Sequence, residues 1–594
     1  MTVGGGDGLD PSARGMVGDT ASAALVAADG TVDWWCPARF DAAAVFTRLL
    51  EPGGPCLRMG PAAPGRPPLG TQAYDPATLV LVTRLEGPES VVDITDAMLW
   101  DGTRPLGRLV RLVRVRRGPA DVAVDLVPGP GEVSLWSEGV AFGGTVVRCP
   151  VEFVTGSAPP PAPARPLRRA VVSGSVRLET GAALVLTVDP PGPAGDPLSP
   201  DAAERLLERT RTAWRRVVDA AVVDGPFVDL AARSVVVLRA LSPAGAPVSS
   251  PVTSLPRVVG GERNTDGRIV RPAAAAAWAR AAAAIGLAEE SDDAVAWLAG
   301  ALEHEPPLPS ELAPDGSAPP TEAPLTALSG WRHSEPVVAG TNAPDRPTTE
   351  AAAAVVAAAA ALGGELEARW DRVVDHADWV ADRWQEPDAT VWDLRGPARP
   401  WVAPRLAVRD ALVRAADRAR RRHPLDLSAA GWTVSVRAVE QWLLRHGLTS
   451  DGMVRSAAAD GPDPEQWDVG VARAAWLGPW PPDDVVVRST LDRVVSRNSD
   501  GPWLVPWPAE LDDGLPGSEP PSVVATLWMA RALALAGEAD AAHERIEAVA
   551  GLAGGLGLLP ESYDARSGLA LGNRPSAEAH VAFLQAVLTP DGRA

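Results

Sequence analysis

Two carboxylates, Glu561 and Asp393, lie in long polar loops of the kind that carry function. Glu561 comes shortly before Tyr563, one of only 2 tyrosines in the chain. Asp393 directly follows Trp392 and comes shortly before Arg395. Carboxyl groups in such surroundings can give and take protons during catalysis. Structural alternatives stay open, because Glu561 also fits a solvated loop and Asp393 also fits an ion pair with Arg395 or a turn cap.

The composition excludes several other kinds of chemistry. The 594-residue chain contains no lysine, so all 55 of its basic side chains are arginine. Without lysine there is no Schiff-base catalysis, no P-loop lysine and no class A β-lactamase lysine. The 3 cysteines lack ligand-pair spacing and the 7 histidines lack metal spacing, so we expect no disulfide framework, metal or cofactor.

Charge and hydropathy bound the partners and the compartment. A formal net charge of −20 disfavours nucleic acid or an anionic membrane surface as the main partner. The segment from Met1 to Asp19 is rich in Gly and Asp and has no apolar run, and no later stretch reaches about 20 apolar residues. We therefore expect a cytoplasmic protein that does not bind membranes. The oligomeric state stays open.

The first third of the chain has the pattern of a β-sandwich. Short apolar runs alternate with Gly- and Pro-containing turns, as expected of many short strands. We assign residues 1–199 to this domain and residues 200–226 to a linker helix with Asp201 as its N-cap. The expected strands are Thr78–Leu85, Val91–Thr95, Leu109–Arg116, Val122–Val127, Val146–Phe153, Val176–Leu178 and Leu184–Val188.

The rest of the chain, residues 227–594, has a helical period. Twelve expected helices form six hairpins, which predicts an (α/α) toroid with its active site where the loops of the inner helices converge. The helices are expected to begin near Phe227, Ala273, Glu289, Thr348, Glu365, Pro404, Leu427, Pro464, Asp483, Pro520, Glu538 and Pro575. The loops expected to carry function are Ser242–Pro272, Glu305–Pro347, Gln385–Ala403, Arg497–Glu519 and Leu558–Arg574.

Five segments, in order from Thr20 to His580, resemble glycoside hydrolase family 15, and specifically its bacterial glucoamylase- and trehalase-like branch. The resemblance implies an N-terminal β-sandwich followed by an (α/α) toroid, in agreement with the helix count. The matching segments are Thr20–Val26 with Asp29–Trp34, Arg39–Asp41, Pro251–Pro256 with Gly260–Asn264, Trp392–Gly396, and Pro560–Asp564 with Leu571–Asn573 and His580.

The resemblance also implies inverting hydrolysis of α-glucosidic bonds, with a small α-glucoside or other carbohydrate as ligand and no metal. Inversion needs two carboxyl groups about 6.5–9.5 Å apart, with a water between one of them and the sugar. Glu561 matches the base position, and Asp393 lies where the family has its catalytic acid. The resemblance places Arg263, Asp266, Arg268, Trp331, Arg332, Trp392, Arg395 and Tyr563 at substrate-binding positions.

Three departures from the family pattern predict an eroded site. Asp393 is one methylene shorter than the family's glutamate. Ala273 and Ala274 replace an Arg–Asp pair that grips glucose hydroxyls in the family. The segment Pro502–Leu511 lacks the family's sugar-binding arginine. Each lost hydrogen bond to a charged group removes about 1.5–3 kcal/mol of binding.

Three functions follow from these observations. The first is a family 15-type hydrolase that acts weakly on a short α-glucoside such as trehalose or maltose. The second is a non-catalytic descendant that binds a carbohydrate or a protein through the old cleft. The third is an enzyme with a different sugar, whose acidic or phosphorylated group is read by Arg271 or Arg346.

Overall fold

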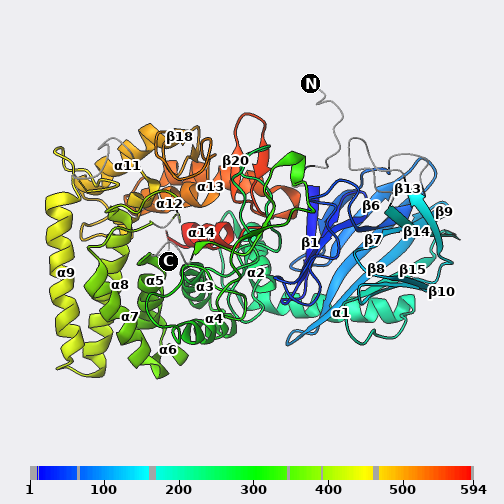
Figure 1. Ribbon diagram of the computed structural model, residues 1–594, viewed down its shortest axis with the longest axis horizontal. Coiled ribbons are helices and arrows are strands. Elements are labelled where there is room, and N and C mark those ends of the chain that lie inside the picture. The colour runs from blue at the N-terminus through cyan, green and yellow to red at the C-terminus, as the bar shows by residue number, and fades with distance from the viewer. Residues whose placement is uncertain are drawn as a thin grey trace.

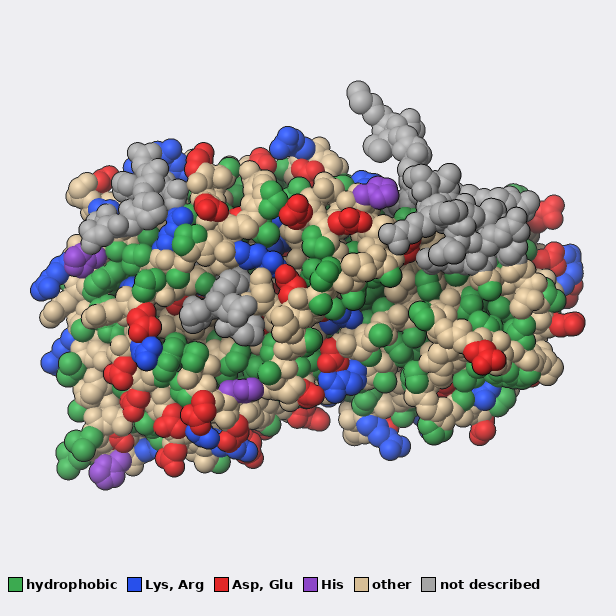
Figure 2. Space-filling view, viewed as in Figure 1, with side chains coloured by type: hydrophobic (Ala, Val, Ile, Leu, Met, Phe, Trp, Pro, Cys, Tyr) green, Lys and Arg blue, Asp and Glu red, His purple; other side chains and the backbone are tan. Residues whose placement is uncertain are grey.

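A computed structural model describes residues 10, 13–62, 67–158, 169–343, 348–389, 392, 394–458 and 467–589. A β-sheet region, a long helix and a ring of helices follow one another along the chain (Figure 1). Acidic and basic side chains are interspersed over the face shown in Figure 2. Within the described ranges, no helix has the length and apolar character needed to cross a membrane.

The β region consists of two antiparallel sheets, and the expected sandwich is confirmed. Strand β9 shows the reason, because its residues are buried in alternation, as a sheet with one face on a core requires. The seven-stranded sheet has the order β1-β2-β3-β4-β9-β14-β13, and the eight-stranded sheet has the order β10-β11-β12-β15-β8-β7-β6-β5. The strands are β1 Arg14–Gly18, β2 Ala23–Ala27, β3 Thr31–Trp35, β4 Cys56–Pro61, β5 Thr71–Tyr74, β6 Leu81–Glu86, β7 Val91–Trp100, β8 Pro105–Arg117, β9 Ala120–Val127, β10 Val133–Trp136, β11 Gly139–Phe142, β12 Thr145–Arg148, β13 Val154–Ala158, β14 Arg169–Leu178 and β15 Ala183–Asp189.

Helix α1, Pro200–Ala220, joins the two regions and packs on β7, β8 and β15. Its buried Trp214 lies against Trp100 of β7 with ring centroids 4.2 Å apart. The N-cap is Ser199, whose hydroxyl accepts a hydrogen bond from the Ala202 backbone N–H. The prediction of Asp201 as the N-cap was therefore wrong. Because proline is favoured as the first helical residue, Pro200 begins the helix and the N-cap is the residue before it.

The helical region forms a closed ring of inner helices with outer helices around it, which confirms the expected toroid. The inner helices α3, α5, α8, α10, α12 and α14 contact one another in sequence, and α14 returns to α3. In Figure 1 the last helix, α14, lies in the middle of the helical region. The helices after α1 are α2 Val228–Ala240, α3 Pro272–Ala284, α4 Ala288–Ala301, α5 Glu350–Leu362, α6 Glu365–Ala368, α7 Trp370–Arg383, α8 Val402–Arg422, α9 Leu427–His446, α10 Ala474–Leu477, α11 Val485–Asn498, α12 Val523–Leu535, α13 Ala539–Ala553 and α14 Ala577–Leu588.

One expected helix differs from the others. Its predicted start, Pro464, lies outside the described residues. Its place in the ring is taken by a 3-10 helix, Val469–Arg473, that continues into the four-residue α10. Asp468 caps this turn by accepting the Gly470 backbone N–H at 2.8 Å.

Alanine explains why the ring encloses a cavity. Helix α3 is almost entirely alanine, and α5 carries alanine on most of its buried positions. Small side chains let neighbouring helices approach closely, but they do not reach far into the centre of the ring. The inner helices therefore leave space along the axis of the toroid.

Candidate active site

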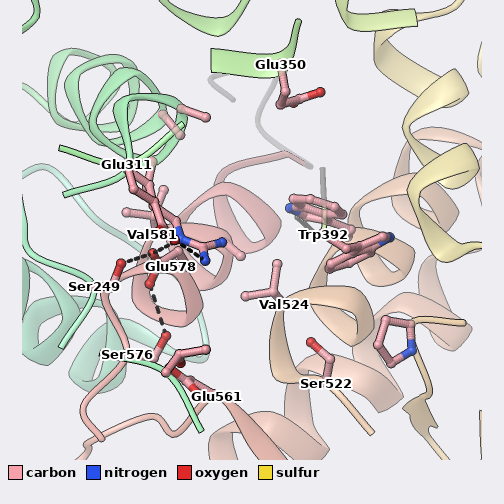
Figure 3. Close-up of a pocket in the computed structure, with 18 of the residues that line it drawn as sticks. Ser249, Glu311, Glu350, Trp392, Ser522, Val524, Glu561, Ser576, Glu578 and Val581 are labelled. Carbon is pink, nitrogen blue, oxygen red and sulfur yellow. Dashed lines mark hydrogen bonds and ion pairs between the residues drawn. The ribbon is translucent and has the colours of Figure 1, made fainter. Parts of the chain in front are cut away.

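A cavity of about 340 Å³ lies inside the helical ring. The inner helices form its walls, and residues from all five loops that the sequence singled out contribute to its lining. Figure 3 shows Glu561 and Glu578 on one side and Trp392 on the other, with Val524 between them. The convergence of distant loops on one end of the toroid is confirmed by this arrangement.

Glu561 is held at the cavity wall by its backbone and by one side chain. Its carbonyl oxygen accepts the Val523 N–H at 3.0 Å, at the first residue of α12. The hairpin β20 Ser562–Asp564 and β21 Leu569–Leu571 follows it directly. The Asn573 amide donates to Glu561 Oε1 at 3.3 Å.

Burial raises the pKa of the Glu561 carboxyl to about 6. The negative charge of Glu578 raises this pKa further, whereas the positive charge of Arg257 lowers it. A carboxylate with this pKa is still mostly ionised at neutral pH, and it is a stronger base than an ordinary glutamate.

Glu561 differs from the other carboxylates of the cavity in its partners. Among the described lining residues it is the carboxylate without an ion pair within 4.0 Å. Ion pairing stabilises the charged form and makes a carboxylate a poorer proton acceptor. The paired lining carboxylates are Asp266, Glu311, Glu322, Glu350, Asp410, Asp513, Glu519 and Glu578.

Asp393 lies outside the described residues, but its neighbours line the cavity. The Trp392 ring packs against Trp528 and Trp507, with centroid distances of 5.1 and 5.8 Å. The Arg395 guanidinium donates two hydrogen bonds to Glu322, at 3.0 and 2.6 Å. Arg395 therefore has Glu322 as its carboxylate partner.

Arg263 lines the cavity, and both of its terminal Nη groups are hydrogen-bonded to protein groups. Its guanidinium pairs with Asp513 at 2.6 Å and with Glu519 at 2.7 Å. It also donates to the carbonyl oxygens of Leu515 and Gly517. Arg263 thus holds the loop 513–519, which contributes Asp513, Leu515 and Glu519 to the cavity lining.

Asp266 and Arg268 form a buried bidentate pair with two contacts of 2.8 Å. Asp266 also accepts the Gly340 N–H at 2.9 Å and touches the cavity lining. Arg268 does not line the cavity, because its guanidinium turns toward the β region, where it donates to the Ala42 carbonyl. This pair joins the loop 250–270 to neighbouring segments.

Besides Arg268, three residues that the resemblance assigned to the substrate lie away from the cavity lining. Trp331 is buried in the core, and the exposed Arg332 stacks on its ring at 4.4 Å. Tyr563 packs on Trp503 with ring centroids 4.5 Å apart. These three placements argue against direct sugar contacts. Arg346, considered as a reader of an acidic group, lies outside the described residues.

A polar network occupies the wall next to Ala273 and Ala274, which both line the cavity. Arg271 pairs with Glu311 at 2.7 Å and approaches Glu578 at 3.9 Å. Ser249 donates to Glu578 at 2.5 Å (Figure 3).

The sequence reading missed Glu311 and Glu578. Glu578 is the acidic residue in the first turn of α14, a place where acidic side chains are common, so its local sequence did not distinguish it as a cavity residue. In the described residues, no group of three or more His, Cys, Asp or Glu side chains is placed to hold a metal ion.

Comparison with known proteins agrees with this architecture. A family model described as "Glycosyl hydrolases family 15" matches residues 229–549, and one described as "Trehalase-like, N-terminal" matches residues 6–136. A trehalase of Mycobacterium tuberculosis (strain ATCC 25618 / H37Rv) is 27% identical over 619 residues, covering 96% of this chain and 88% of that protein. A trehalase of Mycolicibacterium smegmatis (strain ATCC 700084 / mc(2)155) is 26% identical, covering 97% of this chain and 90% of that protein.

A solved bacterial glucoamylase in complex with acarbose has the same fold. It superposes with a TM-score of 0.70 at 13% sequence identity, and the match covers 100% of this chain and 96% of that chain. At this identity the likeness concerns the fold alone. It supports the order of a β-sandwich followed by an (α/α) toroid.

Proposed function

Because this chain belongs to family 15 of the glycosyl hydrolases, we propose that its cavity hydrolyses an α-glucosidic bond of a short substrate such as trehalose or maltose. The trehalase names of its relatives support the choice of a short substrate. The position of the cavity inside the ring supports it too, since the walls leave room for a compact ligand. We also propose the domain boundaries given by the sequence: a β-sandwich domain over residues 1–199, a linker helix over residues 200–226 and the (α/α) toroid over residues 227–594.

The observation that carries this proposal is the unpaired Glu561 carboxylate with its raised pKa. Glu561 accepts a proton from a water, which attacks the anomeric carbon from the face opposite the leaving group. The leaving oxygen takes a proton from the acid, a role that we assign to Asp393 from the family pattern. Inversion follows, because the water attacks directly and no glycosyl–enzyme bond forms.

The remaining candidate residues divide into two groups in this proposal. Trp392 and Arg395 line the cavity and are proposed to contact the sugar. Arg263 and Asp266 also line it, but their bonds to protein groups make them positioning residues. Arg268, Trp331, Arg332 and Tyr563 are proposed to support these walls from outside the lining.

We expect turnover to be slow compared with that of an enzyme that has an Arg–Asp clamp. Ala273 and Ala274 offer no hydrogen bonds to the hydroxyls of the reacting ring. A clamp that strengthens in the transition state lowers the barrier, so its loss removes rate as well as affinity.

The test is release of glucose from trehalose and maltose at high enzyme concentration, with the anomer followed by NMR. From trehalose we expect β- and α-glucose in equal initial amounts, because the attacked ring is inverted and the leaving ring keeps its α configuration. From maltose we expect the non-reducing ring to be released as β-glucose, and Glu561→Gln should release no glucose from either substrate. Asp564→Asn is the matched control, since it makes the same carboxylate-to-amide change in the following hairpin, away from the cavity lining. Equal rates for the wild type and Glu561→Gln would reject the proposal.

A second candidate function is sugar or protein binding without turnover, and the two cavity-lining alanines favour it. Calorimetric titration with trehalose, together with the assay of glucose release, distinguishes the binding protein from the hydrolase. Binding of trehalose that is unchanged in Glu561→Gln, together with no glucose release by the wild type, supports the binding protein. Release by the wild type that depends on Glu561 excludes it.

A further inference from the structure

The cavity extends well below the level of Glu561. Three inner helices each line it with residues seven positions apart: Ala273 and Arg280 on α3, Val524 and Arg531 on α12, and Glu578 and Gln585 on α14. Seven residues are about two helical turns, or roughly 10 Å of rise. The lining therefore has an outer level, near Glu561, and an inner level, which includes Arg280, Arg531 and Gln585.

Arg280 and Arg531 differ from the other arginines that line the cavity. Neither makes an ion pair or hydrogen bond with any described residue. Arg531 is only 7% exposed. Its Nε–H has no acceptor among the described residues, as is also the case for Arg257, Arg263 and Arg473, but these three have carboxylate partners at their Nη groups. The paired lining arginines are Arg257, Arg263, Arg271, Arg395 and Arg473.

The surroundings of the two arginines are aromatic and positive. The Arg531 guanidinium lies over the Trp476 ring at 4.7 Å, which occupies one face of the group and leaves its edge N–H groups free. The nearby Asp410 carboxylate is already paired with Arg414 at 2.7 Å. Burial and the positive charges of Arg280 and Arg414 lower the pKa of Arg531 to about 10, so it stays charged at neutral pH.

A buried guanidinium without a carboxylate partner is costly, and proteins normally pair or hydrogen-bond such a group. Here the unused N–H donors belong to residues that line the cavity. Guanidinium groups bind carboxylate and phosphate oxygens with two parallel hydrogen bonds. We propose that Arg280 and Arg531 bind an anionic group, a phosphate or a carboxylate, at the inner end of the cavity.

This site differs from the one that the sequence indicated for an acidic group. Arg271 was one of the residues expected to bind that group, but its guanidinium charge is neutralised by Glu311 and Glu578. The anion at the inner level is either carried by the sugar that occupies the outer level or is a free phosphate. Binding there does not depend on the proposed hydrolysis, because Glu561 takes no part in it.

The experiment is calorimetric titration of the full chain in a low-salt, chloride-free buffer. The probes are inorganic phosphate, glucose, glucose 6-phosphate and glucuronate, each at millimolar concentration. Arg531→Met and Arg280→Met keep the length of the side chain and remove its charge. Arg545→Met is the matched control, since Arg545 is a buried arginine of outer helix α13, also with an unpaired Nε–H, that does not line the cavity.

We expect at least one anionic probe to bind the wild type, with an affinity at least tenfold weaker in Arg280→Met and Arg531→Met and unchanged in Arg545→Met. Without ligand, the two cavity variants should melt at the same temperature as the wild type or higher, because each loses a charge that has no ion-pair partner among the described residues and that is buried at Arg531 and half-buried at Arg280. A purely structural arginine would instead lower the melting temperature when replaced.

The probes distinguish the two sources of the anion. Phosphate that binds as tightly as glucose 6-phosphate identifies a free-phosphate site. Glucose 6-phosphate or glucuronate that binds more tightly than both glucose and phosphate identifies a group carried by the sugar. No binding of any anionic probe to the wild type, or equal affinities in all variants, would overturn the proposal.

Discussion

Gly572 lies directly against the side chain of Glu561. A Cβ atom at position 572 would stand 2.6 Å from Glu561 Oε2 and 2.7 Å from Glu561 Cβ. The residue also has a φ of +75°, which an L side chain rarely adopts. Gly572 thus sets the space in which the Glu561 carboxylate sits, and its N–H bonds to the Pro256 carbonyl at 2.9 Å.

The first prediction is that Gly572→Ala displaces the Glu561 carboxylate. A displacement of about 1 Å can cost on the order of 100-fold in rate, so we expect a loss of about that size in kcat. Gly568→Ala is the control, because Gly568 has a similar φ of +72° in the same hairpin and no atom within 4 Å of the added Cβ. Both variants should lose about 1–2 kcal/mol of stability. Equal kcat values in the two variants would contradict the prediction.

The second prediction concerns pH. Glu561 must be ionised to accept a proton, and its pKa is raised to about 6. Activity should therefore fall about tenfold per pH unit below about pH 6. Arg257→Gln removes the charge that lowers this pKa, so the acidic limb of the kcat/KM profile should move to higher pH. Arg257→Lys keeps a positive charge, so its acidic limb should lie closer to that of the wild type. An acidic limb near pH 4 in the wild type and both variants would refute the assignment of Glu561 as the base.

The third prediction is that Arg263 stabilises the loop 513–519 rather than the substrate. Arg263→Met leaves the buried carboxylates of Asp513 and Glu519 without this partner. Breaking a buried pair in this way costs about 3–5 kcal/mol, which urea denaturation of the wild type and the variant can measure. Arg39→Met, which breaks the exposed pair with Asp41, should cost less than about 1 kcal/mol. Similar midpoints for Arg263→Met and the wild type would show that the loop does not depend on Arg263.

The fourth prediction concerns His580, which joins α14 to the segment before Glu561. Its Nε2 accepts the Leu559 N–H at 3.1 Å, so its Nδ1 carries the proton and donates to Ser234 Oγ at 2.9 Å. Burial lowers the pKa of His580 from 6.5 to about 3. Between these values the unfolded chain binds a proton that the folded protein does not, so stability falls as pH falls, by about 1.4 kcal/mol per pH unit.

His580→Gln removes this titration and keeps an acceptor for the Leu559 N–H. The measurement is the denaturant midpoint of both proteins at several pH values between 6.5 and 4. We expect the variant to be less stable at pH 7 but to lose less stability on acidification. Parallel pH dependences would show that His580 is protonated equally in the folded and unfolded states.

Much of the architecture could be predicted from the chain because secondary structure is encoded locally. The alternation of β9 and the alanine-rich faces of α3 and α5 are short-range patterns, and the expected helices begin within a few residues of the observed ones. The exception is the helix expected from Pro464, where the described residues instead show a 3-10 helix, Val469–Arg473, followed by the four-residue α10.

The loops that form the site could also be predicted, but the burial and the ion-pair partners of the side chains in them could not. Arg263 looked like a sugar-binding residue beside Asn264. It is in fact neutralised by Asp513, a partner 250 residues away in the sequence. Trp331 likewise looked like a sugar platform, and it is buried in the core.

Composition therefore excluded reactions that need a lysine side chain. Local periodicity predicted a β domain followed by a helical domain, and it predicted which loops converge at the site. Only the packed ring decided which charges are compensated. Ion pairing depends on contacts between distant segments. Within the described part of the chain, it leaves Glu561, Arg280 and Arg531 without an ion pair at two levels of one cavity and neutralises the other charged lining residues.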